Sequence, residues 1–284
     1  MTQLINQQIL MSGADYFDVV DINSYSHHIS SVDPSKAMAE HEAIRSAAQD
    51  AGIEIVKVDA PMDCQDGIFT ANWALIRGDK AVMSSLPNMR QAEEPFAEAA
   101  LRFLGKEIIK PPYRFSGQGD ALPCGNLLFC GSNYRTDPRM HEFLAETLGY
   151  EVIGLQTIPE LDEDGTPVTN VLTGWPDSFF YDIDLAISIL REDLIAWCPD
   201  AFTLESQEKM RSVNIEKIEV SLDEATKGFA CNLLSTGETV IMSAHAPELQ
   251  KAIEAHGLNT ITPIVSELGK GGGYIRCTTL TLDN

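Results

Sequence analysis

The sequence predicts an α/β fold made of five similar units. A helix, a residue that ends it and a strand follow one another repeatedly along the chain. Turn residues between these helix–strand units indicate hairpins. The five helix stops fall at residues 52, 105, 149, 214 and 257, and their mean spacing of about 50 residues is at the upper end for internal repeats. Five such units could close into a ring with strands inside and helices outside. An ordinary open α/β sheet is the alternative that this pattern leaves open.

The helices have recognisable starts and stops. Asp33 and Pro34 are typical of an N-cap followed by Pro at the first helical position, and this helix runs to Gly52 before the strand IEIVKVDA. The other units are a helix over 90–104 before KEIIK, a helix from Asp137-Pro138 to Gly149 before YEVIGL, a helix before Asn214 and IEKIEV, and a helix over 247–256 before LNTITPI. We expect Asn214 to adopt the left-handed conformation that Gly supplies in the other units.

Hairpins are expected between these helix–strand units. NWALIRGDKAVMSS turns around Gly78, and CNLLSTGETVIMSA turns around Gly237. The chain has 284 residues of which 44% are hydrophobic, enough to bury a sizeable core in one large domain or two smaller ones. We expect one domain over residues 1–284.

Charge and hydropathy exclude several classes of partner. The formal net charge is −22 with a pI near 4.5, which argues against nucleic acid because phosphate binding needs clustered Lys and Arg. No stretch approaches the roughly 18 apolar residues of a membrane span, and the start MTQLINQQILMSGADYF lacks a basic leader followed by an apolar run. We therefore expect a cytoplasmic protein that acts on a small molecule without binding a membrane, and a homo-oligomer is left open.

The six cysteines predict neither a zinc site nor a disulfide framework, because none shows CxxC spacing or a neighbouring His. No metal or other cofactor is expected. Most of these cysteines should be small buried hydrophobes. Cys277 has a more suggestive context, because Gly271 to Gly273 form a flexible loop just before it that could present its sulfur to a pocket.

Acidic and amide side chains recur near the predicted strand ends. YDIDLAISIL alternates like a buried strand, which would point Asp182 and Asp184 to the same face. Asp66 and Asn72 bracket DGIFTAN, and Asp120 ends the Gly-rich turn RFSGQGD. Taken alone, Asp120 is more typical of a turn cap than of a ligand. The three clusters together are more suggestive of a site.

The motifs DGIFTANWALI, MRQAEEP, FSGQGDAL, CGSNYRTD, FFYDIDLAI, FACN and SELGKGGGYIRCTTL occur here in sequence order. In this order and spacing the chain resembles the guanidino-modifying enzymes: arginine deiminases, arginine dihydrolases, dimethylarginine dimethylaminohydrolases and amidinotransferases. The resemblance spans nearly the whole chain. It implies the pentein fold, a five-bladed α/β propeller with pseudo-fivefold repeats, which fits the five units counted above.

The resemblance also implies a covalent mechanism. Cys277 matches the nucleophile that attacks the guanidinium carbon, and Asp184 matches the Asp of the family's His-x-Asp strand, so both are expected to be catalytic. Asp66 and Asn72 match substrate-orienting and pocket-lining positions. A planar cation needs anionic, directional acceptors, and a thiolate beside a cation has a lowered pKa.

Two arginines match positions that bind the substrate α-carboxylate in dihydrolase-like members. These are Arg90 in MRQAEE and Arg135 in YRTD, and the guanidinium fork suits a carboxylate. The alternative for Arg90 is a helix-surface salt bridge with Glu93 or Glu94.

Two positions depart from the family. Asp182 stands where the family has the catalytic His, and Ser116 stands where it has the Glu of Phe-Glu-Gly. One carboxylate is lost and another gained, so a guanidinium could still be held between Asp182, Asp184 and Asp66, with Ser116 and Asp120 beside them. Mutual repulsion with Asp184 could raise the pKa of Asp182 enough for acid/base work, although a bound cation opposes that shift.

Three functions follow as hypotheses. The first is a hydrolase that cleaves C–N bonds of a guanidino amino acid through a covalent Cys277 intermediate, with chemistry altered at Asp182; an amidinotransferase is the less favoured variant. The second is a pentein that has lost catalysis and binds an amino acid or a protein partner. The third is an enzyme whose substrate lacks a guanidinium. The histidines offer no obvious replacement base, although His27 or His28 could fold over the pocket.

Overall fold

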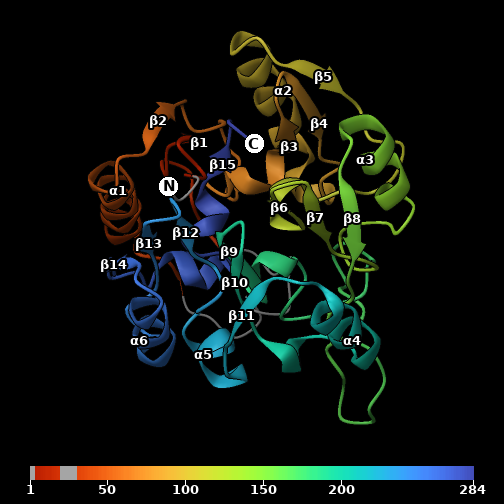
Figure 1. Cartoon of the computed structure of the whole chain (residues 1–284). Helices are drawn as coiled ribbons and strands as arrows, with labels where there is room; N and C mark the ends of the chain where they lie inside the picture. The colour runs from red at the N-terminus through yellow and green to blue at the C-terminus, as the bar shows by residue number, and fades with distance from the viewer. Residues whose placement is uncertain (1–3, 20–30) are drawn as a thin grey trace.

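The computed structural model describes residues 4–19 and 31–284, and within them five small sheets surround a common centre (Figure 1). Each sheet has three strands, and successive sheets follow one another around the ring. This is the pseudo-fivefold α/β propeller that the repeat pattern predicts, and it rules out the open sheet. His27 and His28, which the sequence indicated as residues that could fold over the pocket, lie outside the described residues.

All five sheets share one topology, in which the first strand pairs antiparallel with the second and the second pairs parallel with the third. In this order the strands are β3 (Ala74–Arg77), β4 (Lys80–Met83) and β5 (Glu107–Ile109); β6 (Ala121–Cys124), β7 (Leu127–Cys130) and β8 (Glu151–Gly154); β9 (Ile187–Arg191), β10 (Leu194–Trp197) and β11 (Glu216–Glu219); β12 (Leu234–Ser235), β13 (Thr239–Ile241) and β14 (Asn259–Ile261); and β15 (Leu280–Thr281), β1 (Gln8–Met11) and β2 (Glu54–Lys57). The last sheet closes the ring by joining the two ends of the chain.

One helix per unit makes the parallel crossover from the second strand to the third, as such a connection requires. These helices are α1 (Pro34–Asp50), α2 (Glu94–Phe103), α3 (Met140–Leu148), α4 (Leu204–Ser212) and α6 (Pro247–Ala255), and the short α5 (Leu222–Lys227) links β11 to β12. Figure 1 shows the helices outside the strands. The first strands are mostly buried and the third strands half exposed, so the core lies toward the centre.

The predicted helix ends are confirmed at four of the five units. The Asp33 side chain caps α1 by accepting a hydrogen bond from the Lys36 N–H. Gly52, Gly105, Gly149 and Gly257 all have positive φ, between 73° and 87°. The prediction for Asn214 is wrong: it is not among the positive-φ residues, because α4 ends at Ser212 and Val213 already continues in extended conformation, with φ −70° and ψ 125°.

The Asp-x-Asp segment does not belong to a strand, contrary to its alternating pattern. Residues Ile183–Leu185 form a one-turn 3₁₀-helix (η5), and β9 begins only at Ile187. Cys277 likewise lies in a one-turn 3₁₀-helix, η8 (Arg276–Thr278), before β15. The chain is therefore turning sharply where it carries its most chemically active side chains. No helix among the described residues is long and apolar enough to cross a membrane.

Candidate active site

The candidate site is built from turns that immediately precede the first strands of the sheets. Asn72 lies in η2 (Thr70–Trp73) before β3, Asp184 in η5 before β9, and Cys277 in η8 before β15. Asn232 occupies the equivalent place before β12. Because the first strands are the inner ones, these turns meet at one end of the ring's centre. The fold thus brings together residues more than 200 positions apart.

A cavity of about 10 Å³, room for one water molecule, lies among these turns. Its lining combines an acid, an amide, two cations, aromatic side chains, glycines and the candidate nucleophile: Asp66, Phe69, Asn72, Arg90, Arg135, Tyr181, Gly271, Gly273 and Cys277. Five of the predicted site residues, Asp66, Asn72, Arg90, Arg135 and Cys277, therefore line one cavity.

Cys277 is buried and held by two polar neighbours. The Asn232 amide donates to its sulfur at 3.1 Å, and the Asn232 side-chain oxygen accepts from the Cys277 N–H at 3.2 Å. The Cys277 sulfur lies 3.3 Å from Asp184 Oδ2. Burial raises the pKa of the Cys277 thiol well above its usual range, and the Asp184 charge raises it further. Without a bound cation, the sulfur is a thiol at neutral pH.

Asp184 is the carboxyl beside the nucleophile that titrates near neutrality. Burial, followed by the Asp182 charge, raises the pKa of Asp184 to about 8, while Arg276 opposes the shift. The sequence pattern had assigned this role to Asp182. Because Asp184 lies within reach of the Cys277 sulfur, it can accept the thiol proton once a positive charge enters the cavity.

Asp182 is fully buried and serves as an acceptor at the site. Its Oδ2 accepts hydrogen bonds from Asn72 Nδ2 at 2.7 Å and from Arg135 Nη1 at 3.4 Å. The Arg135 guanidinium also lies over the Tyr181 ring, 3.9 Å from its centroid. Arg135 is thus directed toward the reacting end, where the resemblance would have a His; its predicted bond to a substrate carboxylate stays a prediction.

Arg90 forms a salt bridge with Glu93, the partner expected if Arg90 did not bind a substrate. This salt bridge lies in the protein interior and not on the helix surface. Its Nε and Nη2 donate to the two Glu93 oxygens at 2.7 and 2.8 Å, and Nη1 donates to Asn72 Oδ1 at 2.8 Å. The fork of the guanidinium is therefore occupied by Glu93. Arg90 positions the Asn72 amide, and direct binding of a substrate carboxylate by Arg90 stays a prediction.

Ser116 and Asp120 lie behind the cavity rather than on it. Both the Ser116 hydroxyl and its carbonyl accept from Asn72 Nδ2, at 3.0 and 3.1 Å. Asp120 Oδ1 accepts from the Ile183 N–H at 3.0 Å, which fixes the Asp-x-Asp turn. Burial and the Asp182 charge raise the pKa of Asp120 well above its usual range. Asp120 thus caps the Asp-x-Asp turn rather than the Gly-rich turn that it ends. Like Asp182 and Asp184, neither Ser116 nor Asp120 lines the cavity, and their predicted contacts with a substrate stay predictions.

Three buried carboxylates around the nucleophile each keep one oxygen without a donor. These atoms are Asp66 Oδ2, Asp182 Oδ1 and Asp184 Oδ1. Buried polar atoms are normally hydrogen-bonded, so such a cluster indicates a ligand that brings donors. Burial also raises the pKa of Asp66 to about 6, although Arg90 opposes that shift.

The glycines before Cys277 are required by close packing. A Cβ on Gly273 would lie 2.6 Å from the Phe69 ring and 3.0 Å from Cys277 Cβ, and one on Gly271 would lie 2.9 Å from the Phe17 ring. Gly272 has a φ of 83°. The predicted close-approach loop is confirmed, and larger residues would fill the cavity.

Sequence reasoning did not single out Asn232, Tyr181 or Arg276. A signal for Asn232 was present, because FACN ends two residues before β12 just as FTAN ends two residues before β3. The repeat therefore equates Asn232 with Asn72. Tyr181 was visible only as an aromatic residue beside the two aspartates. Among the described residues, no group of His, Cys, Asp and Glu side chains could hold a metal ion.

No family model matches the chain. The chain is 28% identical over 262 residues to the N(G),N(G)-dimethylarginine dimethylaminohydrolase of Mycobacterium tuberculosis, and the match covers 92% of this chain and 80% of that protein. Its fold superposes on the N-terminal domain of ArgZ, a cyanobacterial arginine dihydrolase bound to substrate, with a TM-score of 0.86, 25% identity and coverage of 97% and 98%. The chain belongs to the pentein superfamily of guanidino-modifying enzymes.

This pentein corresponds to only part of some relatives. It is 27% identical to the bifunctional arginine dihydrolase/ornithine cyclodeaminase ArgZ of Synechocystis, over 96% of this chain but 37% of that protein. A further structure of the ArgZ N-terminal domain, covalently bound to a reaction intermediate, superposes with a TM-score of 0.85 and 25% identity. The predicted superfamily and fold are thereby confirmed.

Proposed function

We propose that this pentein hydrolyses a C–N bond of a guanidino compound of the arginine class through a covalent intermediate on Cys277. The observation that carries the proposal is the set of unpartnered carboxylate oxygens on Asp66, Asp182 and Asp184. Asp66 lines the cavity with Cys277, and Asp184 lies 3.3 Å from the Cys277 sulfur. A guanidinium offers several N–H donors and a delocalised positive charge, which match such acceptors. Relatives named as a dimethylarginine dimethylaminohydrolase and as arginine dihydrolases support the same substrate class.

Binding of the cation activates the nucleophile. The positive charge lowers the pKa of both Asp184 and Cys277. Burial raises both values, and the Asp182 charge adds to the shift at Asp184 while the Asp184 charge adds to the shift at Cys277. The thiol proton then passes to the Asp184 carboxylate across the 3.3 Å contact. In this order of events, the Cys277 sulfur stays protonated until a positively charged substrate is bound.

The reaction has two balanced steps. In the first, the thiolate forms an S–C bond to the guanidinium carbon, one C–N bond breaks, and the departing ammonia or amine takes the proton from Asp184. In the second, water adds to the S-amidino carbon and the S–C bond breaks. A ureido product leaves, and the water protons return to the sulfur and to the carboxylates.

Asp182 is the base that we assign to the second step. It stands where related enzymes would have a His, and its free Oδ1 can accept a proton from water while Oδ2 is held by Asn72 and Arg135. A carboxylate is in general a weaker base than an imidazole. We therefore expect the second step to be slow and the adduct on Cys277 to accumulate.

The test is a screen with intact-protein mass spectrometry. The protein is incubated with arginine, agmatine, methylarginines and guanidinoacetate, and ammonia, amines and ureido products are assayed alongside the protein mass. An amidino adduct that is present in the wild type and absent from Cys277→Ser supports the proposal. Cys124→Ser is the control for a non-specific adduct, because Cys124 lies outside the cavity.

The alternatives give different results in the same screen. Binding of a guanidino compound with no adduct and no product would indicate a catalytically inactive pentein. Release of the amidino group only to an added amine would indicate a transferase. Turnover of a compound without a positive charge would contradict the role given to the three carboxylates.

A further inference from the structure

The fold contains a second cavity. It has a volume of about 420 Å³, within the range of small-molecule sites, and it shares no lining residue with the cavity at Cys277. Its walls come from β6, β9 and the hairpin turns that follow them, from residues 4–6 and 283–284, and from Cys231, Leu233 and Arg276, which precede the first strands β12 and β15. The two cavities are therefore distinct, and Arg276 of this cavity directly precedes Cys277 of the other along the chain.

A buried cation faces this cavity without a carboxylate partner. Arg276 is only 7% exposed, and its Nη1 and Nη2 donate to neutral acceptors: the Thr279 carbonyl and hydroxyl, and Gln118 Oε1 at 2.9 Å. Among the described residues, no carboxylate oxygen lies within 4.0 Å of its guanidinium. Buried charges in proteins are normally paired, so the position of Arg276 indicates an anionic ligand.

An unpartnered hydroxyl lies in the same wall. The Ser188 side chain is 4% exposed, lines the cavity, and its Oγ has no hydrogen-bond partner. A buried hydroxyl without a partner costs free energy, which a ligand oxygen in the cavity would recover. Ser188 lies on β9 and Arg276 on η8, so the two groups come from different units of the ring.

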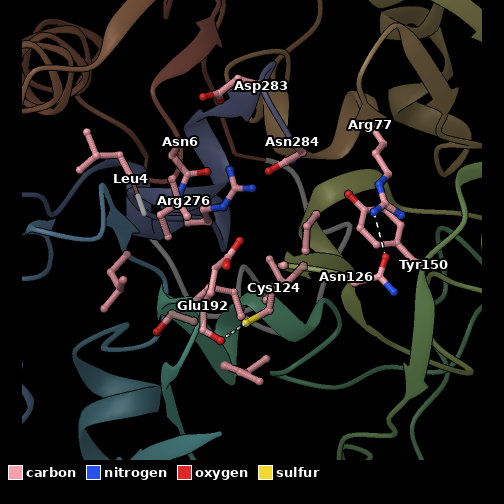
Figure 2. Close-up of a pocket in the computed structure, with 18 of the residues that line it drawn as sticks. Leu4, Asn6, Arg77, Cys124, Asn126, Tyr150, Glu192, Arg276, Asp283 and Asn284 are labelled. Carbon is pink, nitrogen blue, oxygen red and sulfur yellow. Dashed lines mark hydrogen bonds between the residues drawn. The ribbon is translucent and has the colours of Figure 1, made fainter. Parts of the chain in front are cut away.

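A carboxylate, Glu192, also belongs to the lining. Glu192 lies in the turn after β9, its carboxylate packs over Gly125, and Figure 2 shows it and Arg276 projecting into the same space. The two side chains form no ion pair. Arg77 also lines the cavity but is already engaged, through hydrogen bonds to the Leu148 carbonyl and Asn126 and by stacking on Tyr150. Asp283 also lines the cavity and accepts a hydrogen bond from the Gln7 N–H. The groups that a ligand could bind are thus the Arg276 cation, the Ser188 hydroxyl, the Glu192 carboxylate and the unpartnered Asn284 amide.

We propose that this second cavity binds a small zwitterion of the α-amino acid class, with its carboxylate on Arg276 and Ser188 Oγ and its ammonium group toward Glu192. The ligand would bridge two buried or half-buried charges that are too far apart to neutralise each other. Its side chain would pack on the apolar part of the wall, which includes Leu122, Ile187 and Leu233. This site is independent of the function proposed for Cys277.

The test is isothermal titration calorimetry on the full chain with glycine, L-alanine and L-ornithine, each compared with its N-acetyl derivative and its methyl ester. We expect at least one parent amino acid to bind and both derivatives to bind about tenfold more weakly, because each lacks one charge. Glu192→Gln and Ser188→Ala should weaken binding of the parent by a similar factor. Asp193→Asn, an exposed neighbour of Glu192 outside the cavity, should bind as the wild type does.

The variant Arg135→Gln shows which of the two cavities binds the amino acid, because Arg135 lines only the cavity at Cys277. Binding that survives in Arg135→Gln and weakens in Glu192→Gln supports the second site. Binding lost in Arg135→Gln and unchanged in Glu192→Gln would assign the amino acid to the cavity at Cys277 and overturn the proposal. Equal binding of the derivatives and the parent, or no heat up to about 10 mM of any parent compound, would overturn it as well.

Discussion

Replacing Asp184 with Asn should make the folded protein more stable at alkaline pH. In the wild type, burial and the Asp182 charge raise the pKa of Asp184 from 3.8 to about 8. Between these two values the folded chain holds a proton that the unfolded chain has released, so the free energy of unfolding falls as the pH rises. The asparagine side chain resembles the protonated carboxyl in size and charge and does not titrate, which removes this dependence.

The size of the stability difference follows from the shift in the pKa of Asp184. Each pH unit between about 4 and 8 lowers the free energy of unfolding by about 1.4 kcal/mol, so the full loss is on the order of 5 kcal/mol. The contribution of Asp184 is fully present below pH 4 and is lost as the pH passes through about 8. The wild type and Asp184→Asn should therefore have similar stability near pH 4 and differ most above pH 8.

Urea denaturation at several pH values between 4 and 9 measures the difference. Asp66 and Asp120 also have raised pKa values, so the wild-type profile alone does not isolate one group. The difference between wild type and Asp184→Asn does, and Asp193→Asn, whose side chain is exposed, provides the matched control. Parallel profiles for wild type and Asp184→Asn would refute the assignment of the raised pKa to Asp184.

Three further predictions concern the same cavity. Asn232→Ala removes the amide that donates to the Cys277 sulfur, so alkylation of Cys277 by iodoacetamide at pH 8 should slow by about tenfold; mass spectrometry measures it, and an unchanged rate would contradict the role of the amide. Gly273→Ala adds a methyl group 3.0 Å from Cys277 Cβ and should abolish adduct formation with a guanidino substrate, whereas Gly269→Ala, whose nearest neighbour is 3.4 Å away, should retain it. Binding of a guanidino compound at pH 7 should release protons, because the cation lowers the pKa of Asp184 from about 8; calorimetry in two buffers of different ionisation enthalpy detects this, and equal heats would argue against it.

The repeat pattern predicted the five units because it rests on local chemistry, whereas the closed ring was implied by the resemblance to the pentein family. Helix caps, Gly stops and hairpin turns depend on residues close in sequence, and they recur at each unit. The failure at Asn214 shows the limit: a residue that can adopt a left-handed conformation need not do so when the preceding residue already leaves the helix. The sequence could not choose between these two ends of α4.

The sequence singled out five of the residues that line the cavity, Asp66, Asn72, Arg90, Arg135 and Cys277, but it did not predict their contacts. The pattern of YDIDLAISIL indicated a strand, because hydrophobic alternation cannot distinguish a strand from a buried 3₁₀ turn. The partners of Arg90 and Arg135 depend on which turns meet at the centre of the ring. Such long-range contacts leave no local signal, so the inward orientation of Arg135 toward Asp182 could be seen only in the folded chain.

The closure of the ring has a consequence for the order in which the protein matures. The turn that carries Cys277 is held by β15, and β15 pairs with β1, so that Ile9 lies opposite Thr281. During synthesis β1 is made early and waits for nearly the whole chain before its partner exists, which makes this the most delayed pairing in the fold. Cys277 itself lies only a few residues before β15, so it can join Asn232 and Asp184 only after nearly the whole chain has been made. The candidate nucleophile is therefore added to the site late in synthesis, after the turns that carry Asn72, Asp184 and Asn232.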